Sequence, residues 1–283
     1  MKTILVTGAN SGVGLALSRA LVERGHAVIM AVRDVQRGDA ARAELQSLVP
    51  DASVRVEPLD LERLDSVRAL ADRPFDVDVL VNNAAIAFEP MRLTAEGVHA
   101  QFGINHLGHF ALTALLFERL SARGEGRVVH VTSTLAKKGT IDFDGLDGTG
   151  GFSSMRAYTE SKIANILFGA ELARRLRASD SNVRSVLVHP GVPATAMQQK
   201  AKGVIGVVAR IVSALMGKPP SHGANAMLEA AINVDVQSGD LWEPGRTTRD
   251  APRRVTPWPT MSSREDAARL WERSEALTGL RFL

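Results

Sequence analysis

The sequence predicts an α/β fold with a doubly wound parallel sheet of about seven strands and helices on both faces. Short runs of β-branched and apolar residues recur along the chain, and stretches with helical period separate them. This alternation of strand and helix is typical of crossover units in a parallel sheet. Because the strand runs are apolar on both faces, helices must cover both sides of the sheet.

The expected strands are short apolar runs that end at polar or glycine-rich positions. They lie at residues 4–6, 28–30, 54–56, 79–81, 128–131 and 186–188, with a further short run around Leu241 and Trp242. The expected helices cover 13–24, 35–48, 61–71, 107–120 and 158–176. Asp34 directly precedes the second of these helices, and its carboxylate is expected to serve as the N-cap.

The regular alternation stops after residue 188. Residues 190–220 are expected to form a loop and an apolar helix over 204–216, which together make a lid near 192–220. A further helix is expected over 222–233.

The chain then continues into a C-terminal extension, residues 243–283. Residues 243–259 are rich in Arg, Pro and Thr, which is typical of an extended surface segment. Ser262 or Ser263 is expected to cap a last helix that reaches Leu277.

Composition and charge exclude several classes of protein. The 283 residues are 45% hydrophobic and 23% charged, which is ordinary for a globular chain. No cysteine is present, so a disulfide framework, a thiolate metal site and a cysteine nucleophile are excluded. The 34 basic and 31 acidic residues are scattered, so nucleic-acid binding is not expected. The longest apolar stretch, 203–216, contains Arg210 and is shorter than the ~20 residues of a membrane span, so we expect a cytoplasmic protein.

A glycine-rich turn follows the first strand and opens the first helix. It runs Thr7-Gly8-Ala9-Asn10-Ser11-Gly12-Val13-Gly14. Glycines let the backbone approach a pyrophosphate, and a helix N-terminus offers free N–H groups and the positive end of its dipole. The turn alone also fits a tight connection without a ligand, so the prediction of a dinucleotide site depends on the residues that accompany it.

Tyr158 and Lys162 stand four residues apart on an expected helix, so both project from one face. A free phenol has a pKa of about 10, and a nearby ammonium group would lower that pKa and make Tyr158 a usable proton donor. Tyr158 is the only tyrosine of the chain. An ordinary amphipathic helix would also explain this pair on its own.

Ser133 follows the strand at 128–131, which places its hydroxyl at the carboxyl end of the sheet, where doubly wound folds bind ligands. It could therefore hydrogen-bond a substrate carbonyl, and the neighbouring Thr132 is the alternative hydroxyl. His106 and His109 stand three residues apart, but the sequence shows no third ligand beside them, so no metal site is expected.

The order and spacing of these motifs resemble the short-chain dehydrogenase/reductase family. The resemblance rests on the glycine-rich turn, Asp60-Leu61, Asn82-Asn83-Ala84-Ala85, Asn105, Ser133, Tyr158 with Lys162, and His189-Pro190-Gly191. The strings at residues 102–110, 161–165 and 270–274 resemble the retinol-dehydrogenase-like branch of that family. The resemblance spans nearly the whole chain and implies a Rossmann-type fold.

The family resemblance also implies a role for each matching residue. Tyr158 would be the general acid, Ser133 would polarise the carbonyl, and Lys162 would bind the ribose and lower the Tyr158 pKa. Asn105 would bend its helix and hold a water of a proton relay. The implied cofactor contacts are Gly8, Asn10, Ser11, Gly12, Val13, Gly14, Arg33, Asp60, Leu61, Asn82, Ala84, Tyr158, Lys162, Pro190, Gly191, Val192 and Thr195.

The end of the second strand indicates the cofactor. In the family pattern Val32 occupies the position of an NAD-type aspartate, and Arg33 occupies the position of an arginine that binds the 2′-phosphate of NADP. Asp34 stands 20 residues after Gly14, which is also a common spacing for the acid that binds the ribose of NAD. We take Asp34 as a helix cap and expect NADP(H).

The expected organisation is one Rossmann-type domain, residues 1–283, with a dinucleotide-binding part over 1–135 and a catalytic and substrate part over 136–283. Ala85 and Pro193 depart from the family pattern without removing a reacting group. The expected function is NADP(H)-dependent interconversion of a carbonyl and an alcohol on a hydrophobic small molecule, in a homodimer or homotetramer. The alternative is a catalytically silent dinucleotide-sensing regulator of the same fold.

Overall fold

The computed structural model describes residues 1–191 and 218–283 and confirms the predicted fold class. The strands in these residues form one eight-stranded sheet in the order β3-β2-β1-β4-β5-β6-β7-β8. They are β1 (Thr3–Thr7), β2 (Ala27–Val32), β3 (Val54–Pro58), β4 (Val79–Asn82), β5 (Arg127–Val131), β6 (Arg184–Val188), β7 (Leu241–Glu243) and β8 (Arg253–Val255). All neighbouring strands are parallel except β7 and β8, which are antiparallel.

Strand β8 was not predicted from the sequence, because residues 243–259 were expected to form an extended surface segment. It is only three residues long, and both of its arginines are exposed. A strand of three residues is too short to show an alternation of apolar and polar side chains. It is recognised as a strand only by its antiparallel pairing with β7 at the edge of the sheet.

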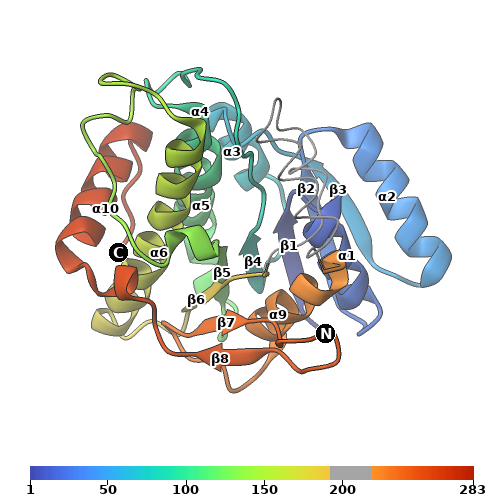
Figure 1. Ribbon diagram of the computed structural model, residues 1–283. Coiled ribbons are helices and arrows are strands. Elements are labelled where there is room, and N and C mark those ends of the chain that lie inside the picture. The colour runs from blue at the N-terminus through green and yellow to red at the C-terminus, as the bar shows by residue number, and fades with distance from the viewer. Residues whose placement is uncertain (192–217) are drawn as a thin grey trace.

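Helices cover both faces of the sheet, as predicted (Figure 1). They are α1 (Gly12–Val22), α2 (Val35–Leu48), α3 (Leu64–Ala71), α4 (Ala100–Phe102), α5 (Gly108–Ser121), α6 (Ser154–Ala178), α9 (Pro220–Ile232) and α10 (Arg264–Thr278). One face packs against α1, α2 and α9, and the other against α3, α5 and α6, with α10 on the outer side of α6. The expected lid helix over 204–216 lies outside the described residues.

Strand β1 shows how the sequence builds two cores. Ile4 and Val6 belong to the buried cluster that includes residues of α1 and α9, whereas Leu5 between them belongs to the other cluster, with residues of α5 and α6. Alternate side chains of a strand point to opposite faces of the sheet, so a run that is apolar at every position buries both faces.

The helix expected over 107–120 corresponds to α5, Gly108–Ser121. A π-helical turn, Gly103–Leu107, joins α4 to α5 and carries Asn105, the residue that the family resemblance expected to bend its helix. Such turns widen the backbone of a helix and are frequent at functional sites.

The order of the sheet reverses between β1 and β4, whose following helices lie on opposite faces. A crevice forms at the carboxyl ends of the strands at such a switch point. In residues 1–191 and 218–283, none of the helices has the length and apolar character needed to span a membrane.

Candidate active site

A cavity of about 550 Å³ opens at the carboxyl ends of β1, β2, β4 and β5. The predicted site residues that line it are Gly8, Asn10, Ser11, Gly12, Val13, Gly14, Arg33, Asp60, Leu61, Ala84, Ser133, Tyr158, Lys162, Pro190 and Gly191. Asn82 and Asn105 are buried behind its wall. Val192, Pro193 and Thr195 lie outside the described residues.

The glycine-rich turn forms a cradle that side chains would fill. Gly8 and Gly12 have φ angles of 66° and 56°, in the left-handed region that favours glycine. A Cβ atom on Gly14 would lie 2.6 Å from Asn83 Nδ2 and closer still to the Gly8 carbonyl oxygen. Ser11 precedes α1 without capping it through its side chain, so the helix presents its first N–H groups at the cavity.

Tyr158 and Lys162 lie on α6 and both face the cavity. The Lys162 side chain is 3% exposed, and its Nζ donates a hydrogen bond to the Val131 carbonyl oxygen at 3.3 Å. The same nitrogen lies 5.9 Å from the centre of the Tyr158 ring. Asn165, one turn further along α6, also donates to Val131 O at 3.1 Å, so this helix is fixed to the end of β5.

The pKa of the Tyr158 phenol moves opposite to the direction expected from its lysine neighbour. Burial raises this pKa to about 12, and a hydrogen bond with the Ser133 side chain opposes part of the rise. Burial also lowers the pKa of Lys162 to about 8. Because desolvation dominates at both groups, the phenol keeps its proton at neutral pH, and the equilibrium of the lysine shifts from the ammonium form toward the neutral amine.

The two candidate hydroxyls after β5 have different partners. Thr132 is buried, and its Oγ1 donates to the Lys162 carbonyl oxygen at 3.0 Å. Ser133 lies beside Tyr158 at the cavity and accepts a long hydrogen bond of 3.4 Å from Leu135 N. Ser133 is therefore the hydroxyl of the two that remains available to a ligand.

Hydrogen bonds connect Asn105 to α6 through Ser161. Its Oδ1 accepts from Ile86 N at 2.8 Å, and its Nδ2 donates to Ile86 O and to Ser161 Oγ, both at 2.9 Å. Ser161 Oγ in turn donates to the Tyr158 carbonyl oxygen at 2.7 Å. The amide of Asn105 therefore holds a cavity loop against the turn of α6 that carries Tyr158.

The far end of the cavity contains more positive charge than the sequence indicated. Arg33 and Arg37 both line it, and both side chains are exposed. Asp34 accepts a hydrogen bond from Arg37 N at 3.1 Å, which confirms its prediction as the N-cap of α2. Arg37 was not predicted as a site residue, although it lies in the first turn of α2, four residues after Arg33.

Phe88 forms part of an apolar wall beside Tyr158. The wall comprises Ile86, Ala87, Phe88, Ile104 and Leu135. Phe88 has a φ angle of 58°, which a bulky residue rarely adopts, and its N–H donates to Gln101 Oε1 at 2.8 Å. Buried Gln101 also donates to Ser154 O at 3.0 Å, at the start of α6. Phe88 could not be predicted as a site residue, because no local sequence pattern indicates its positive φ angle.

Asn82 and Ala85 differ in their position relative to the cavity. The Asn82 amide donates to Thr113 Oγ1 at 3.1 Å instead of facing the cavity, and Asn83 takes its place in the wall. Ala85, the departure from the family pattern, also lines the cavity. Among residues 1–191 and 218–283, no group of three or more His, Asp or Glu side chains could hold a metal ion.

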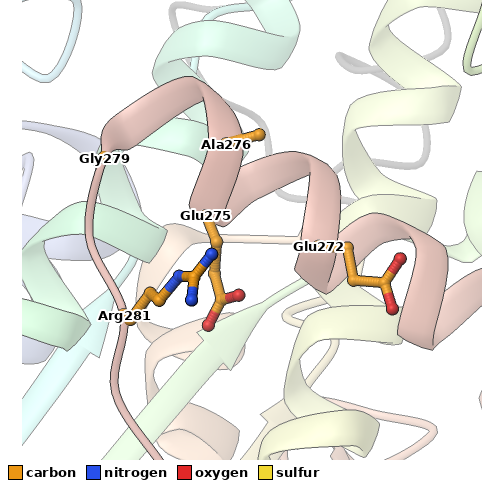
Figure 2. A pocket seen from close by; sticks show the side chains of 5 residues that line it. All are labelled: Glu272, Glu275, Ala276, Gly279 and Arg281. Atoms are coloured by element: carbon orange, nitrogen blue, oxygen red, sulfur yellow. The ribbon is translucent and has the colours of Figure 1, made fainter.

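A second hollow is lined by residues of α10 and of the segment that follows it (Figure 2). It has a volume of about 540 Å³ and is lined by Glu272, Glu275, Ala276, Gly279 and Arg281. Glu275 already accepts a hydrogen bond from Trp271 Nε1 at 3.0 Å. None of the predicted site residues lines this hollow, so the candidate active site is the cavity at the switch point.

Comparison with known proteins decides the family. The family described as short chain dehydrogenase matches residues 2–203. The chain belongs to the short-chain dehydrogenase family. Retinol dehydrogenase 12 of Mus musculus is 35% identical over 287 residues, which cover 99% of this chain and 87% of that protein. Retinol dehydrogenase 14 of Mus musculus is 36% identical, with 99% of this chain and 86% of that protein covered.

Solved structures agree with this assignment. An uncharacterised protein of Mycobacterium paratuberculosis superposes with a TM-score of 0.81 and 37% identity, covering 100% of this chain and 95% of that one. A short-chain dehydrogenase/reductase family protein superposes with a TM-score of 0.65 and 30% identity, covering 86% and 95%. The chain is thus an oxidoreductase of the retinol-dehydrogenase-like branch, and its fold is one that binds a nicotinamide dinucleotide.

Proposed function

We propose that this short-chain dehydrogenase uses NADP(H) to interconvert a carbonyl and an alcohol on a hydrophobic small molecule. The observation that carries the proposal is that Tyr158, Lys162 and Ser133 line the same cavity as the glycine cradle. The cradle fits a dinucleotide because Gly8 and Gly12 are in left-handed conformations and Gly14 leaves no room for a side chain. When bound, the nicotinamide supplies the hydride that reaches the carbonyl carbon.

The chain's own residues supply the proton and the charge. Tyr158 holds its proton at neutral pH, since its pKa is raised to about 12, and it donates that proton to the carbonyl oxygen. Ser133 donates a hydrogen bond to the same oxygen. Lys162 stabilises the phenolate that remains on Tyr158, and Asn105 positions Ser161 and the loop at Ile86 around them.

Charge at the far end of the cavity supports NADP(H) over NAD(H). Arg33 and Arg37 give the 2′-phosphate two guanidinium partners. Asp34 also lines the cavity and is the carboxylate that could favour NAD(H), but its Oδ1 accepts from Arg37 N as the cap of α2. The relatives are named retinol dehydrogenases, and the apolar wall around Phe88 supports a hydrophobic substrate here.

The test is consumption of NADPH and of NADH by the purified protein with a panel of apolar and polar carbonyls. We expect turnover with NADPH and an apolar aldehyde or ketone, and much slower turnover with NADH. Binding of NADPH without turnover of any carbonyl or alcohol would instead favour the dinucleotide-sensing regulator. The homodimeric or homotetrameric state stays a prediction, which sedimentation of the same sample tests.

A further inference from the structure

His109 lies outside the cavity wall, yet its ring joins two parts of the site. It belongs to the first turn of α5 and is 1% exposed. Its Nδ1 lies 2.9 Å from the Asn105 carbonyl oxygen, and its Nε2 lies 2.9 Å from Thr7 Oγ1. The two ring nitrogens therefore contact two different elements, the π-helical turn through Nδ1 and strand β1 through Nε2.

These partners define the tautomer of the ring. A carbonyl oxygen only accepts hydrogen bonds, so His109 Nδ1 must carry a proton and donate it to Asn105 O. Burial, with a smaller contribution from the charge of Lys162, lowers the pKa of His109 to about 4. The ring is then neutral at physiological pH, its Nε2 has no proton, and the Thr7 hydroxyl donates to that nitrogen.

The direction of the Thr7 hydroxyl decides what its oxygen can accept. With its proton given to His109, Thr7 Oγ1 accepts from Asn83 N and from Ala84 N, both at 2.9 Å. Asn83 Nδ2 also donates to Thr7 O at 2.7 Å. Asn83 and Ala84 both line the cavity beside Gly8, so this hydroxyl fixes the loop after β4 against the glycine cradle.

The other end of the ring leads to the catalytic helix. The Asn105 carbonyl that accepts from His109 belongs to the same residue whose amide holds Ser161, and Ser161 bonds to the Tyr158 carbonyl. An alternative acceptor for Thr7, Val81 O, lies at 3.3 Å. Without the ring, the hydroxyl would turn toward Val81, and the link between the two halves of the site would be lost.

We propose that His109, as the neutral tautomer protonated on Nδ1, is a positioning residue that aligns the cofactor-binding loop at Asn83 and Ala84 with the helix that carries Tyr158. This inference rests on the proposed function. It adds a residue that touches neither substrate nor cofactor and acts through Thr7 and Asn105.

His106, three residues earlier, is the matched control. It is also fully buried, and its Nε2 bonds to Ser274 Oγ at 2.8 Å. Its ring packs against Phe102 and Phe168, on the side of α10 and away from the cavity. If His109 only packs in the core, its substitution should have the same effects as substitution of His106. If it positions the site, its substitution should also weaken cofactor binding and slow turnover.

The first experiment measures NADPH dissociation constants, kcat and melting temperature for His109→Phe, Thr7→Val, Thr7→Ser and His106→Phe. We expect His109→Phe and Thr7→Val each to raise the NADPH dissociation constant and to lower kcat about tenfold. His109→Phe removes the ring donor to Asn105 O, and Thr7→Val leaves the N–H groups of Asn83 and Ala84 without their acceptor. The double variant should lose less than the product of the two effects, since both break one network. Thr7→Ser keeps the hydroxyl and should restore binding, and His106→Phe should lower the melting temperature alone.

The second experiment observes the tautomer without any cofactor, by ¹⁵N NMR of histidine-labelled protein with His109→Gln to assign the signal. We expect a neutral ring with the proton on Nδ1 at neutral pH. A proton on Nε2, a charged ring, or a folded His109→Phe variant with unchanged NADPH binding would overturn the inference. Failure of the proposed function would give a different result. The wild type would then turn over no carbonyl, although the NMR signal of His109 would still show a neutral ring with its proton on Nδ1.

Discussion

The ring of Phe88 lies against the ring of Tyr158, with their centroids 5.2 Å apart and their planes inclined by 52°. A buried glutamine, Gln101, fixes the backbone of Phe88 at a positive φ angle and also bonds to the first residue of α6. Strained residues of this kind cluster at functional sites, where surrounding contacts hold them in place. The apolar wall is thus built together with the helix that carries Tyr158.

We expect Phe88→Ala to lower kcat/KM for a large apolar carbonyl by about tenfold, because part of the apolar contact with the substrate is lost. Phe88→Leu keeps much of the apolar surface and serves as the matched control, so it should lose less. Steady-state kinetics with one apolar and one small polar carbonyl measure both effects. An unchanged preference between the two carbonyls in Phe88→Ala would remove this residue from substrate selection.

Arg33→Ala and Arg37→Ala should each raise the dissociation constant for NADPH about tenfold and leave that for NADH nearly unchanged, because only NADPH has a 2′-phosphate. Arg42→Ala is the control, since Arg42 lies on the same helix and pairs with Asp39 at 3.1 Å instead of lining the cavity. Fluorescence titration with both cofactors checks the effect.

Asp34→Ala should cost about 0.5–2 kcal/mol of stability as the N-cap of α2 is lost, without changing the cofactor preference. Urea unfolding and the same two titrations measure these quantities. If the wild type prefers NADH and Asp34→Ala reverses that preference, the carboxylate binds the ribose and the assignment to NADP(H) is wrong.

Lys162 should lose its proton near pH 8 in the free protein, because burial lowers its pKa to about 8. The ammonium form disappears as the pH rises through this value, so carbonyl reduction should slow above about pH 8 when the phenolate of Tyr158 loses its stabilising charge. ¹³C NMR of lysine-labelled protein, with Lys162→Met for assignment, gives the pKa directly. A midpoint near the usual 10.4 of a free lysine would contradict the dominance of burial.

Acid should destabilise the fold through its buried histidines. Burial lowers the pKa of His106 and His130 to about 3, and that of His109 and His189 to about 4. The unfolded chain binds these protons near pH 6.5, so the stability is complete above that pH and is lost as the pH falls toward 4. Each histidine should contribute about 1.4 kcal/mol per pH unit in this window. Urea unfolding between pH 7.5 and about 4.5 checks this, and a constant free energy of unfolding would disprove it.

The strands and helices with a regular apolar period could be predicted from the sequence. So could several residues after strand ends that line the cavity. Asp34 as a cap is one example that a local pattern defines. Arg37 and Phe88 were missed because their roles depend on what the tertiary fold places across the cavity. The π-helical turn around Asn105 depends on bonds to Ile86 and Ser161, which stand 19 and 56 residues away in the chain.

The most direct test of the account is a single-turnover measurement of NADPH oxidation by Tyr158→Phe with an apolar carbonyl that the wild type reduces. The ring and its contact with Phe88 remain, but the proton donor is gone, so the rate should fall by about 10²–10⁴-fold. The dissociation constant for NADPH, measured on the same sample, should stay near that of the wild type. A rate close to that of the wild type would show that Tyr158 is not the acid and that the proposed chemistry is wrong.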